Sequence, residues 1–326
     1  MKTTLSAPRA SILLRVADDY LIWILFGLSV ILMTLVSPRF FSLKNLISIA
    51  LGSSVMGIMV IAATLPFLIG KFDLSIESTL AFAALIGALV VKAGGSAAVA
   101  FAAVVGVGGV IGLVNGIAIV YLGVNPFVQT LAMQIIFRGL IFLITGGIPI
   151  YGFPQQYRVL GNTEIAGIPT PVVILVALYI VFIVVLSRTR WGRRLYAVGQ
   201  NSRAAFISGI NIGRVHLAVF ILAGVLAAFA GLILSSRLDS IDYNVGTGMV
   251  FEVFAAAVIG GISLSGGRGS LVGAIGGVLL LSILSSILTW LNISIYWVDT
   301  TRGFIILFAV VVDAMKNTVR ERLARR

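Results

Sequence analysis

The sequence has no cysteine, one histidine and few charged residues, which make up only 10% of its 326 positions. Without cysteine, the chain can form neither a disulfide nor a thiolate nucleophile. The lone histidine, His216, cannot build a metal cluster by itself. Its simplest role is a ring at the polar end of an apolar segment. We therefore expect no catalytic residue and no metal site in this chain.

Apolar residues dominate instead, at 60% of the sequence, with a mean hydropathy of +1.14. Long apolar runs separated by short polar ones are typical of integral membrane proteins. Since a span needs about 20 apolar residues, we expect an all-α integral membrane protein of about ten transmembrane helices. The expected spans are residues 20–36, 46–69, 74–91, 97–122, 127–144, 169–186, 215–234, 250–264, 271–291 and 296–312.

The net charge of +12 does not by itself indicate a nucleic-acid partner, because membrane proteins carry an excess of Lys and Arg in their cytoplasmic segments. Most of the 23 Lys and Arg residues lie on the side of both termini, which predicts cytoplasmic termini. The first 20 residues hold too short an apolar run for a cleavable signal. We expect a cytoplasmic N-terminal segment (1–19), a first transmembrane half (20–186), a cytoplasmic segment (187–214), a second half (215–313) and a basic cytoplasmic tail (314–326).

Glycine is concentrated in the fourth and ninth expected spans, at Gly106, Gly108, Gly109, Gly112 and Gly116, and at Gly269, Gly273, Gly276 and Gly277. Such spacing lets neighbouring helices approach closely. The stretches VVGVGGV and LVGAIGGV resemble each other, as do ESTLAFAALIG and EVFAAAVIGG. An inverted repeat of two five-helix halves explains both pairs, and chance similarity is the alternative.

The eighth span is short and ends in IGGISLSGGRGS. Irregular backbone at membrane depth is tolerated only where protein buries it or where it lines a cavity. We therefore expect a broken or partly re-entrant helix at this span.

Three ionisable residues, Lys71, Asp73 and Glu77, interrupt the apolar sequence in LIGKFDLSIES. Pro66 and Gly70 predict the end of one helix just before them. Asp73 is suited to cap the next helix, with Glu77 in its first turn near the positive end of the helix dipole. Capping alone and an added contact with a solute both explain these charges.

Three further polar residues lie within or beside expected spans. Arg138 is costly inside an apolar span, so we expect it to face a carboxylate or backbone carbonyls, as a structural ion pair or as a pathway contact. Asn115 and Asn125 offer hydrogen bonds without a charge, which suits a polyhydroxyl solute. Hydrogen bonding between helices explains Asn115 equally well.

The segment from Ser187 to Val215 carries six arginines and no acidic residue. Asn201 or Ser202 as an N-cap and Gly209 as a stop predict one short helix. The segment is a docking element for a partner protein or a helix held by anionic lipid.

No G-x-x-x-x-G-K-[ST] phosphate loop occurs, and the only Gly-Lys pair, at Gly70, lacks its spacing. The chain therefore cannot hydrolyse ATP through such a loop. Residues 146–171, rich in glycine and proline, offer an external surface for a binding protein or form an ordinary connector.

Four stretches carry a family resemblance: KFDLSIES, NPFVQTLAMQIIFRGL, GRRLYAVGQNSRAAFISGINIGRV and AAAVIGGISLSGGRGSLVGAIGG. Together they resemble the permease subunits of sugar-type ABC importers, the ribose, xylose and arabinose group, from the second expected span to the tenth. The resemblance implies a multi-pass permease of the bacterial cytoplasmic (inner) membrane. It implies import of a monosaccharide or similar polyhydroxyl solute.

The resemblance also implies three partners besides the lipid bilayer: a second permease subunit, identical or different, a cytoplasmic ATP-binding subunit, and a periplasmic or extracellular solute-binding protein. ATP and Mg²⁺ belong to the ATPase, so this chain needs no cofactor of its own. By resemblance, the contact with the ATPase comes from Gly199, Asn201, Ala204, Ala205 and Gly209. Asp73 and Ser75 match the Asp-Leu-Ser positions of the family.

The candidate pathway residues are the polar groups in and beside the spans: Asp73, Ser75, Asn115, Asn125, Arg138 and Glu252. Two departures leave the particular sugar open. Gly70, Lys71 and Phe72 stand where the family often has two glycines before Ile-Asp-Leu-Ser, and Val253-Phe254 stands where Leu-Asp is frequent.

Three other classes compete with this reading. Nucleoside and branched-chain amino acid ABC permeases share the broad fold. An ion-coupled secondary transporter usually needs membrane-embedded carboxylates or histidines. Here the carboxylates lie near expected span ends, at Asp73, Glu77, Glu252 and Asp299, and Asp313 closes the last span. A membrane enzyme lacks support, because no constellation of His, Cys and carboxylates emerges.

Overall fold

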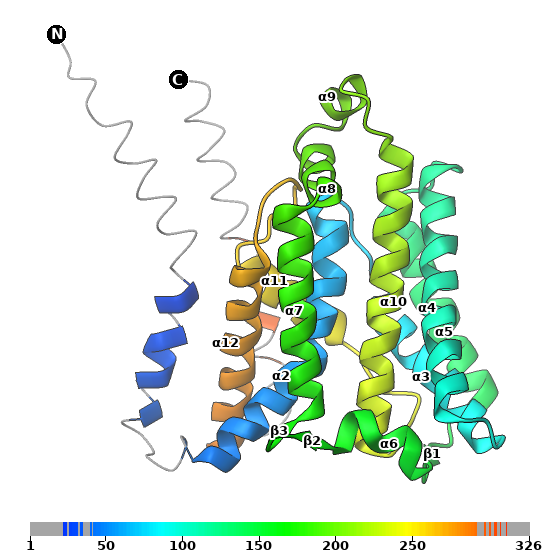
Figure 1. The fold of residues 1–326 in the computed structure, drawn as a ribbon, viewed down its shortest axis with the longest axis vertical. Helices are drawn as coiled ribbons and strands as arrows, with labels where there is room; N and C mark the ends of the chain where they lie inside the picture. Colours follow the sequence, from blue (N-terminus) through cyan, green and yellow to red (C-terminus); the bar gives the residue numbers. More distant parts are fainter. Residues whose placement is uncertain are drawn as a thin grey trace.

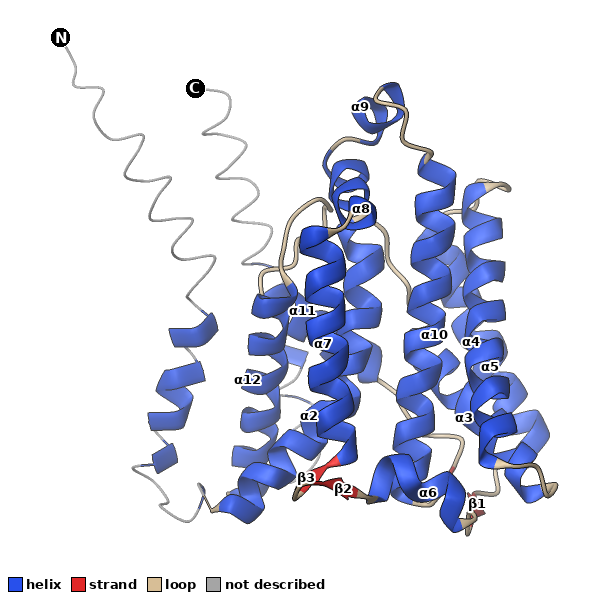
Figure 2. Cartoon of the chain, in the orientation of Figure 1, coloured by secondary structure: helices blue, strands red, loops and turns tan. Residues whose placement is uncertain are grey.

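The computed structural model describes residues 42–291 without interruption, together with residues 22–24, 26–31, 33–34, 40, 297, 300, 303, 304, 307 and 311. Most of the expected tenth span, part of the first, the N-terminal segment 1–19 and the tail 314–326 lie outside the described residues. The described part is a bundle of helices (Figures 1 and 2). The all-α prediction is thereby confirmed.

The helices in chain order are α2 (Leu43–Leu68), α3 (Ile76–Lys92), α4 (Ala97–Val120), α5 (Pro126–Thr145), α6 (Gln155–Asn162), α7 (Thr170–Arg188), α8 (Arg190–Gln200), α9 (Ser202–Ile207), α10 (Ile212–Leu238), α11 (Met249–Ile259) and α12 (Leu271–Trp290). Six of those in the described part, α2, α4, α5, α7, α10 and α12, are long and apolar enough to cross a membrane. Their bounds follow the apolar runs in the sequence.

Two of the helices that lie at expected spans, α11 and α3, are shorter than the six long ones. α11 has 11 residues, and at 1.5 Å per residue it is about 17 Å long, roughly half of a hydrocarbon core about 30 Å thick. The expected span at 250–264 therefore ends too late: the helix stops at Ile259, and Gly261 with φ +87° continues an irregular segment. This agrees with the expectation of a broken helix. α3 has 17 residues.

The chain breaks between α2 and α3, as the sequence predicted. Pro66 lies in the last turn of α2, and Gly70 adopts φ +68°, so the backbone leaves the helix there. The predicted N-cap is wrong, because α3 begins after Ser75. The Oδ1 atom of Asp73 instead accepts hydrogen bonds from the N–H of Ser75 at 2.9 Å and its hydroxyl at 2.6 Å. Asp73 thus closes a turn before the helix.

Glycines bring α4 and α10 into backbone contact. A Cβ atom on Gly112 would overlap the carbonyl of Phe220, and one on Gly224 would overlap the carbonyl of Gly108. The expected close approach is confirmed here and between α11 and α12, where Gly277 lies against Ala256. The inverted repeat itself stays a prediction.

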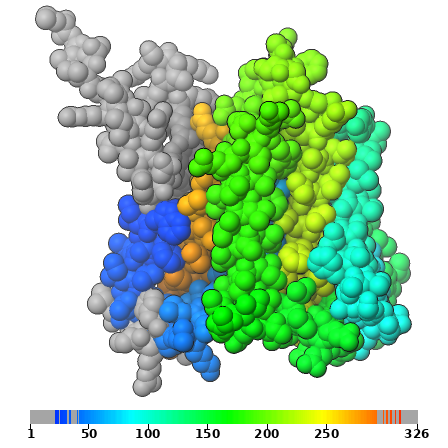
Figure 3. Space-filling view, viewed as in Figure 1, coloured from blue at the N-terminus to red at the C-terminus, as the bar shows by residue number. Residues whose placement is uncertain are grey.

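The two ends of the bundle differ (Figures 1 and 3). At one end, α8 and α9 project beyond the long helices. At the other end, α6 lies across the bundle with four short strands: β1 (Ile150–Tyr151) paired antiparallel with β4 (Ser240–Ile241), and β2 (Glu164–Ile165) paired antiparallel with β3 (Ile168–Pro169). Residues 146–171 therefore contain regular structure, in α6 and three of these strands.

α6 is fixed to the end of α10 by side-chain hydrogen bonds. The hydroxyls of Tyr157 and Ser235 lie 2.8 Å apart, and Ser236 accepts a hydrogen bond from the N–H of Gly161 at 2.8 Å. Burial raises the pKa of Tyr157 to about 12, so its hydroxyl stays protonated at neutral pH. This end of the bundle is held as one unit.

Candidate functional site

A buried polar network surrounds the break between α2 and α3. Asp73 and Ser75 are 2% and 1% exposed, although they lie in irregular backbone. The side-chain amide of Asn115, on α4, donates to the hydroxyl of Ser75 at 2.9 Å. From α5, the hydroxyl of Thr130 accepts the N–H of Leu74 at 3.1 Å. Two neighbouring helices therefore satisfy polar groups that the break leaves without helical partners.

Glu77 joins the two short helices. It lies in the first turn of α3, yet its Oε2 atom accepts the N–H of Val250, in the first turn of α11, at 3.1 Å. Its Oε1 atom accepts a hydrogen bond from the amide of Gln134 at 2.7 Å. The same oxygen lies 3.4 Å from the Nη2 atom of Arg138. One carboxylate therefore touches α3, α5 and α11.

Arg138 completes this contact, which we call the Glu77–Arg138 clamp. Its Nη1 atom donates to the carbonyls of Tyr243 and Val245 at 2.8 and 2.9 Å, in the irregular segment before α11. The sequence predicted a carboxylate or backbone carbonyls as partners, and Arg138 has both. A guanidinium at this depth needs such partners, because an unpaired charge in the membrane costs several kcal/mol.

The network offers hydrogen bonding and charge pairing, but no arrangement for covalent chemistry. Within residues 42–291 and the other described positions, no group of three His, Cys, Asp or Glu side chains is placed to hold a metal ion. Its carboxylates and amides bind one another and the backbone. The arrangement positions two broken helices relative to the long helices around them.

The structure places the six candidate pathway residues in different surroundings. Asp73, Ser75 and Asn115 share the network, and Arg138 joins it through Glu77. Glu252 lies in the first turn of α11 and is half-buried. Asn125 lies apart, where it caps α5 by accepting the N–H of Phe127 at 2.9 Å.

Gln134 and Thr130 were missed by sequence reasoning, although both contact the broken segments. Thr130, Gln134 and Arg138 are spaced four residues apart on α5, which puts these polar groups on one helical face. That periodicity within TLAMQIIFRGL was the available signal.

The predicted short helix in the arginine-rich segment is confirmed as α9. Asn201 caps it by accepting the N–H of Ala204 at 2.9 Å, and Gly209 adopts φ +81° just after its end. Ala205 is buried, whereas Phe206 and Ile207 are 68% and 79% exposed. These two apolar side chains at the projecting end were not among the candidate residues.

Gly199 packs inside the chain rather than on its surface. A Cβ atom there would overlap the carbonyl of Leu68 and the backbone of Gly267. The next residue, Gln200, donates to the carbonyl of Gly267 at 3.3 Å. The hydroxyl of Tyr196 donates to the carbonyl of Gly269 at 2.9 Å, and burial raises the pKa of this tyrosine. α8 therefore contacts both the end of α2 and the segment after α11.

Comparison of the chain with known proteins identifies the family to which it belongs. The family model described as "Branched-chain amino acid transport system / permease component" matches residues 45–310. The chain is 38% identical over 285 residues to the ribose import permease protein RbsC of Escherichia coli, covering 86% of this chain and 89% of that protein. The RbsC protein of Bacillus subtilis is 36% identical over 290 residues, covering 88% and 90%.

A third relative is the L-arabinose ABC transporter permease protein AraH of Azospirillum brasilense. It is 30% identical over 291 residues, covering 89% of this chain and 86% of that protein. No solved structure matches the chain. The match to the family model spans α2 to α12 and both broken helices, so this chain belongs to that family of transport-system permease components.

Proposed function

We propose that this chain is the membrane-spanning permease subunit of an ABC importer that moves a monosaccharide or similar polyhydroxyl solute into the cell. One observation carries the proposal: similarity over most of the chain to relatives named for ribose and arabinose import. The family description names branched-chain amino acids, but these relatives favour a sugar.

The proposed transporter needs other subunits. The sequence lacks a phosphate loop, so a separate ATP-binding subunit supplies ATP hydrolysis with its own Mg²⁺. We assign its docking surface to α9, where Phe206 and Ile207 are exposed beside Arg203. A second permease subunit completes the pathway, and a solute-binding protein docks at the α6 end. In this orientation, α8 and α9 face the cytoplasm at the inner membrane.

The contacts of α8 suggest how movement at α9 reaches the membrane centre. α8 lies against Leu68, at the end of α2, and against Gly267, after α11. The N–H of Gly267 also donates to the carbonyl of Leu68 at 2.8 Å. Displacing α8 therefore shifts the outer ends of both irregular segments together. The Glu77–Arg138 clamp holds the opposite ends of the neighbouring elements, at the start of α3 and the start of α11, so the two irregular segments act as hinges for the pathway.

We assign different roles to the candidate pathway residues. Asp73, Ser75 and Asn115 hold the first break in shape, because their polar atoms bind one another. Arg138 holds the irregular segment that precedes α11. Asn125 and Glu252 remain candidates for direct contact with solute.

Uptake by proteoliposomes tests the proposal. The permease is reconstituted with its ATP-binding subunit and solute-binding protein, and entry of labelled ribose, arabinose and leucine is followed with and without internal ATP. We expect ATP-dependent entry of a sugar and none of leucine. Entry driven by a cation gradient, without the ATP-binding subunit, would reject the importer assignment.

A further inference from the structure

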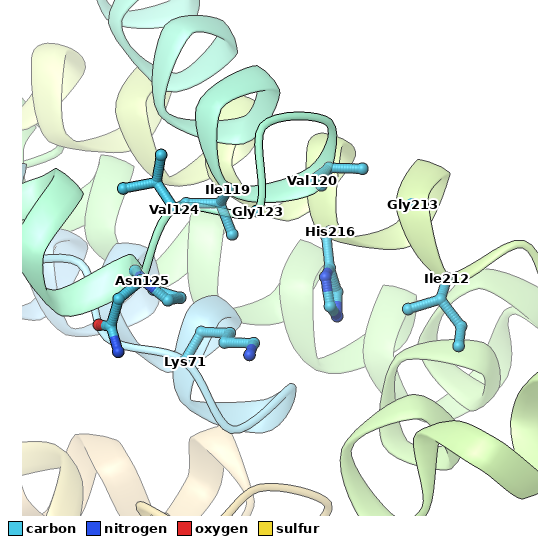
Figure 4. Close-up of a pocket in the computed structure, with 10 residues that line it drawn as sticks. Lys71, Ile119, Val120, Gly123, Val124, Asn125, Ile212, Gly213 and His216 are labelled. Carbon is cyan, nitrogen blue, oxygen red and sulfur yellow. The ribbon is translucent and has the colours of Figure 1, made fainter.

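A pocket of about 400 Å³ lies where the break after α2 meets the beginnings of α5 and α10. Figure 4 shows the Lys71 amine and the His216 ring directed toward each other across the space. Its walls are otherwise mostly apolar, with Asn125 as the other polar side chain. Among the described residues, no Asp or Glu lines it.

Two nitrogen groups in this pocket have no ion-pair or hydrogen-bond partner among the residues that the structure describes. Two ion pairs occur in the described part of the chain, Arg138–Glu77 and Arg158–Asp239, and neither involves Lys71. The amine of Lys71 also makes no side-chain hydrogen bond there. The Nε2 atom of His216 is buried without a hydrogen-bond partner among the same residues. Buried polar atoms are nearly always hydrogen-bonded, so such an atom beside a cation points to a ligand.

The surrounding backbone adds positive potential. α5 begins at Pro126 and α10 begins at Ile212, and both residues line the pocket. The N-terminal end of a helix carries a partial positive charge. The carbonyl end of α4 also borders the pocket, but the carbonyl of Ala118 already accepts the N–H of Val124 at 3.1 Å. The nearby carboxylate of Asp73 is engaged by Ser75.

We propose that this pocket binds the carboxylate end of a polyhydroxy acid of monosaccharide size, with Lys71 as the counter-charge and with His216 and Asn125 as hydrogen-bonding groups. The inference rests on the proposed import function and narrows its solute to a sugar acid. The volume falls within the range of small-molecule sites, about 300–1,000 Å³.

The kinds of donor that line the pocket favour a carboxylate over a phosphate. The described polar side chains are one lysine, one histidine and one asparagine, and none of them offers a planar pair of N–H groups like the guanidinium of arginine. A phosphate monoester carries roughly −1.5 to −2 at neutral pH and is typically held by arginine forks. Among the described residues, no arginine lines the pocket.

The test is binding to the purified full-length permease in lipid nanodiscs, measured by calorimetry with ribonate, ribose and inorganic phosphate. Ribonate and ribose share a carbon chain and differ in the charged group. Lys71→Met removes the cation, Lys71→Arg keeps it, and Lys44→Met removes an exposed lysine in the first turn of α2 as a matched control.

We expect ribonate to bind the unmodified protein about tenfold or more tightly than ribose, because the charge-assisted contact exists only for the acid. Lys71→Met should lose that preference, while Lys71→Arg and Lys44→Met retain it. Equal binding of ribonate and ribose by the unmodified protein, or phosphate binding as tight as ribonate, would overturn the proposal. The comparison of ribonate with ribose uses only the unmodified protein, so it remains valid even if a variant misfolds.

Uptake separates this inference from the importer assignment. If ATP-driven entry of ribose is observed and ribonate neither binds nor enters, the sugar-acid proposal fails and the import function stands. If no solute enters with ATP, the import function itself fails.

Discussion

The α4–α10 contact and the Glu77–Arg138 clamp both hold separate segments of the chain together, but through different interactions. Between α4 and α10, glycines let two backbones touch, and the contact depends on shape alone. At the clamp, one ion pair joins α3 to α5, and hydrogen bonds from Arg138 reach backbone carbonyls in the non-helical segment before α11. The first contact fixes a frame of long helices. The second holds the starts of α3 and α11 against α5.

The largest effect should come from filling the glycine contact. Gly112→Leu would place a side chain where the backbone of Phe220 lies, so we expect destabilisation of about 3 kcal/mol or more. Yield of monodisperse protein and thermal denaturation in detergent measure this effect. Gly106→Leu is the control, because no atom lies within 4 Å of a Cβ at Gly106. Equal loss in both variants would refute the shape argument.

Breaking the clamp should rank second. Arg138→Met leaves the Glu77 carboxylate buried without its counter-charge, which we expect to cost about 2–3 kcal/mol, because Gln134 and the N–H of Val250 still bind the carboxylate. Unfolding of the reconstituted protein gives the value. The double variant Glu77→Gln with Arg138→Met should recover part of the loss, because the amide carries no charge to bury. Additive losses in this cycle would contradict a direct interaction.

A single hydrogen bond at α8 should matter less. Tyr196→Phe removes the bond to the carbonyl of Gly269, and we expect a loss of about 1 kcal/mol. The informative readout is the number of solute molecules moved per ATP hydrolysed, which should fall as α8 loosens from the segment after α11. An unchanged ratio would count against transmission through this joint.

The smallest effect on stability should follow Phe206→Ala. The side chain is 68% exposed, so we expect the free energy of unfolding to change by no more than about 0.5 kcal/mol. Co-purification of the ATP-binding subunit should nevertheless drop. Phe101→Ala, in the long helix α4 and 43% exposed, is the comparison that should leave co-purification intact. Equal recovery with both variants would remove α9 as the docking surface.

Much of the frame could be predicted from the sequence, because each long helix coincides with an apolar run and each glycine cluster marks a close contact. α9 was predictable for a local reason, since Asn201 and Gly209 act within a few residues of themselves. The clamp was only half predictable. Arg138 demanded a partner, but the acceptors at Tyr243 and Val245 are more than 100 positions away and consist of backbone, which carries no sequence signal.

The misplaced cap at Asp73 has a similar cause. An aspartate before a helix can bind the first helical turn or close a tighter turn ahead of it, and neighbouring groups decide between these bonds. Here Asn115 donates to the hydroxyl of Ser75, 40 positions away in the sequence, and that hydroxyl donates to Asp73. Gly199 illustrates the same limit, because its contact with Gly267 depends on how α8 folds back onto the bundle.

The natural absence of cysteine allows a direct test of the central claim, that the α8–α9 end faces the cytoplasm and receives the ATP-binding subunit. Phe206→Cys places one thiol on α9, and Ile165→Cys places one on β2 at the opposite end, where the native side chain is 53% exposed. Both are treated with a membrane-impermeant maleimide in right-side-out and inside-out vesicles. The account predicts labelling at position 206 only in inside-out vesicles, blocked by the ATP-binding subunit, and labelling at position 165 only in right-side-out vesicles. Labelling of position 206 from the outside would contradict it.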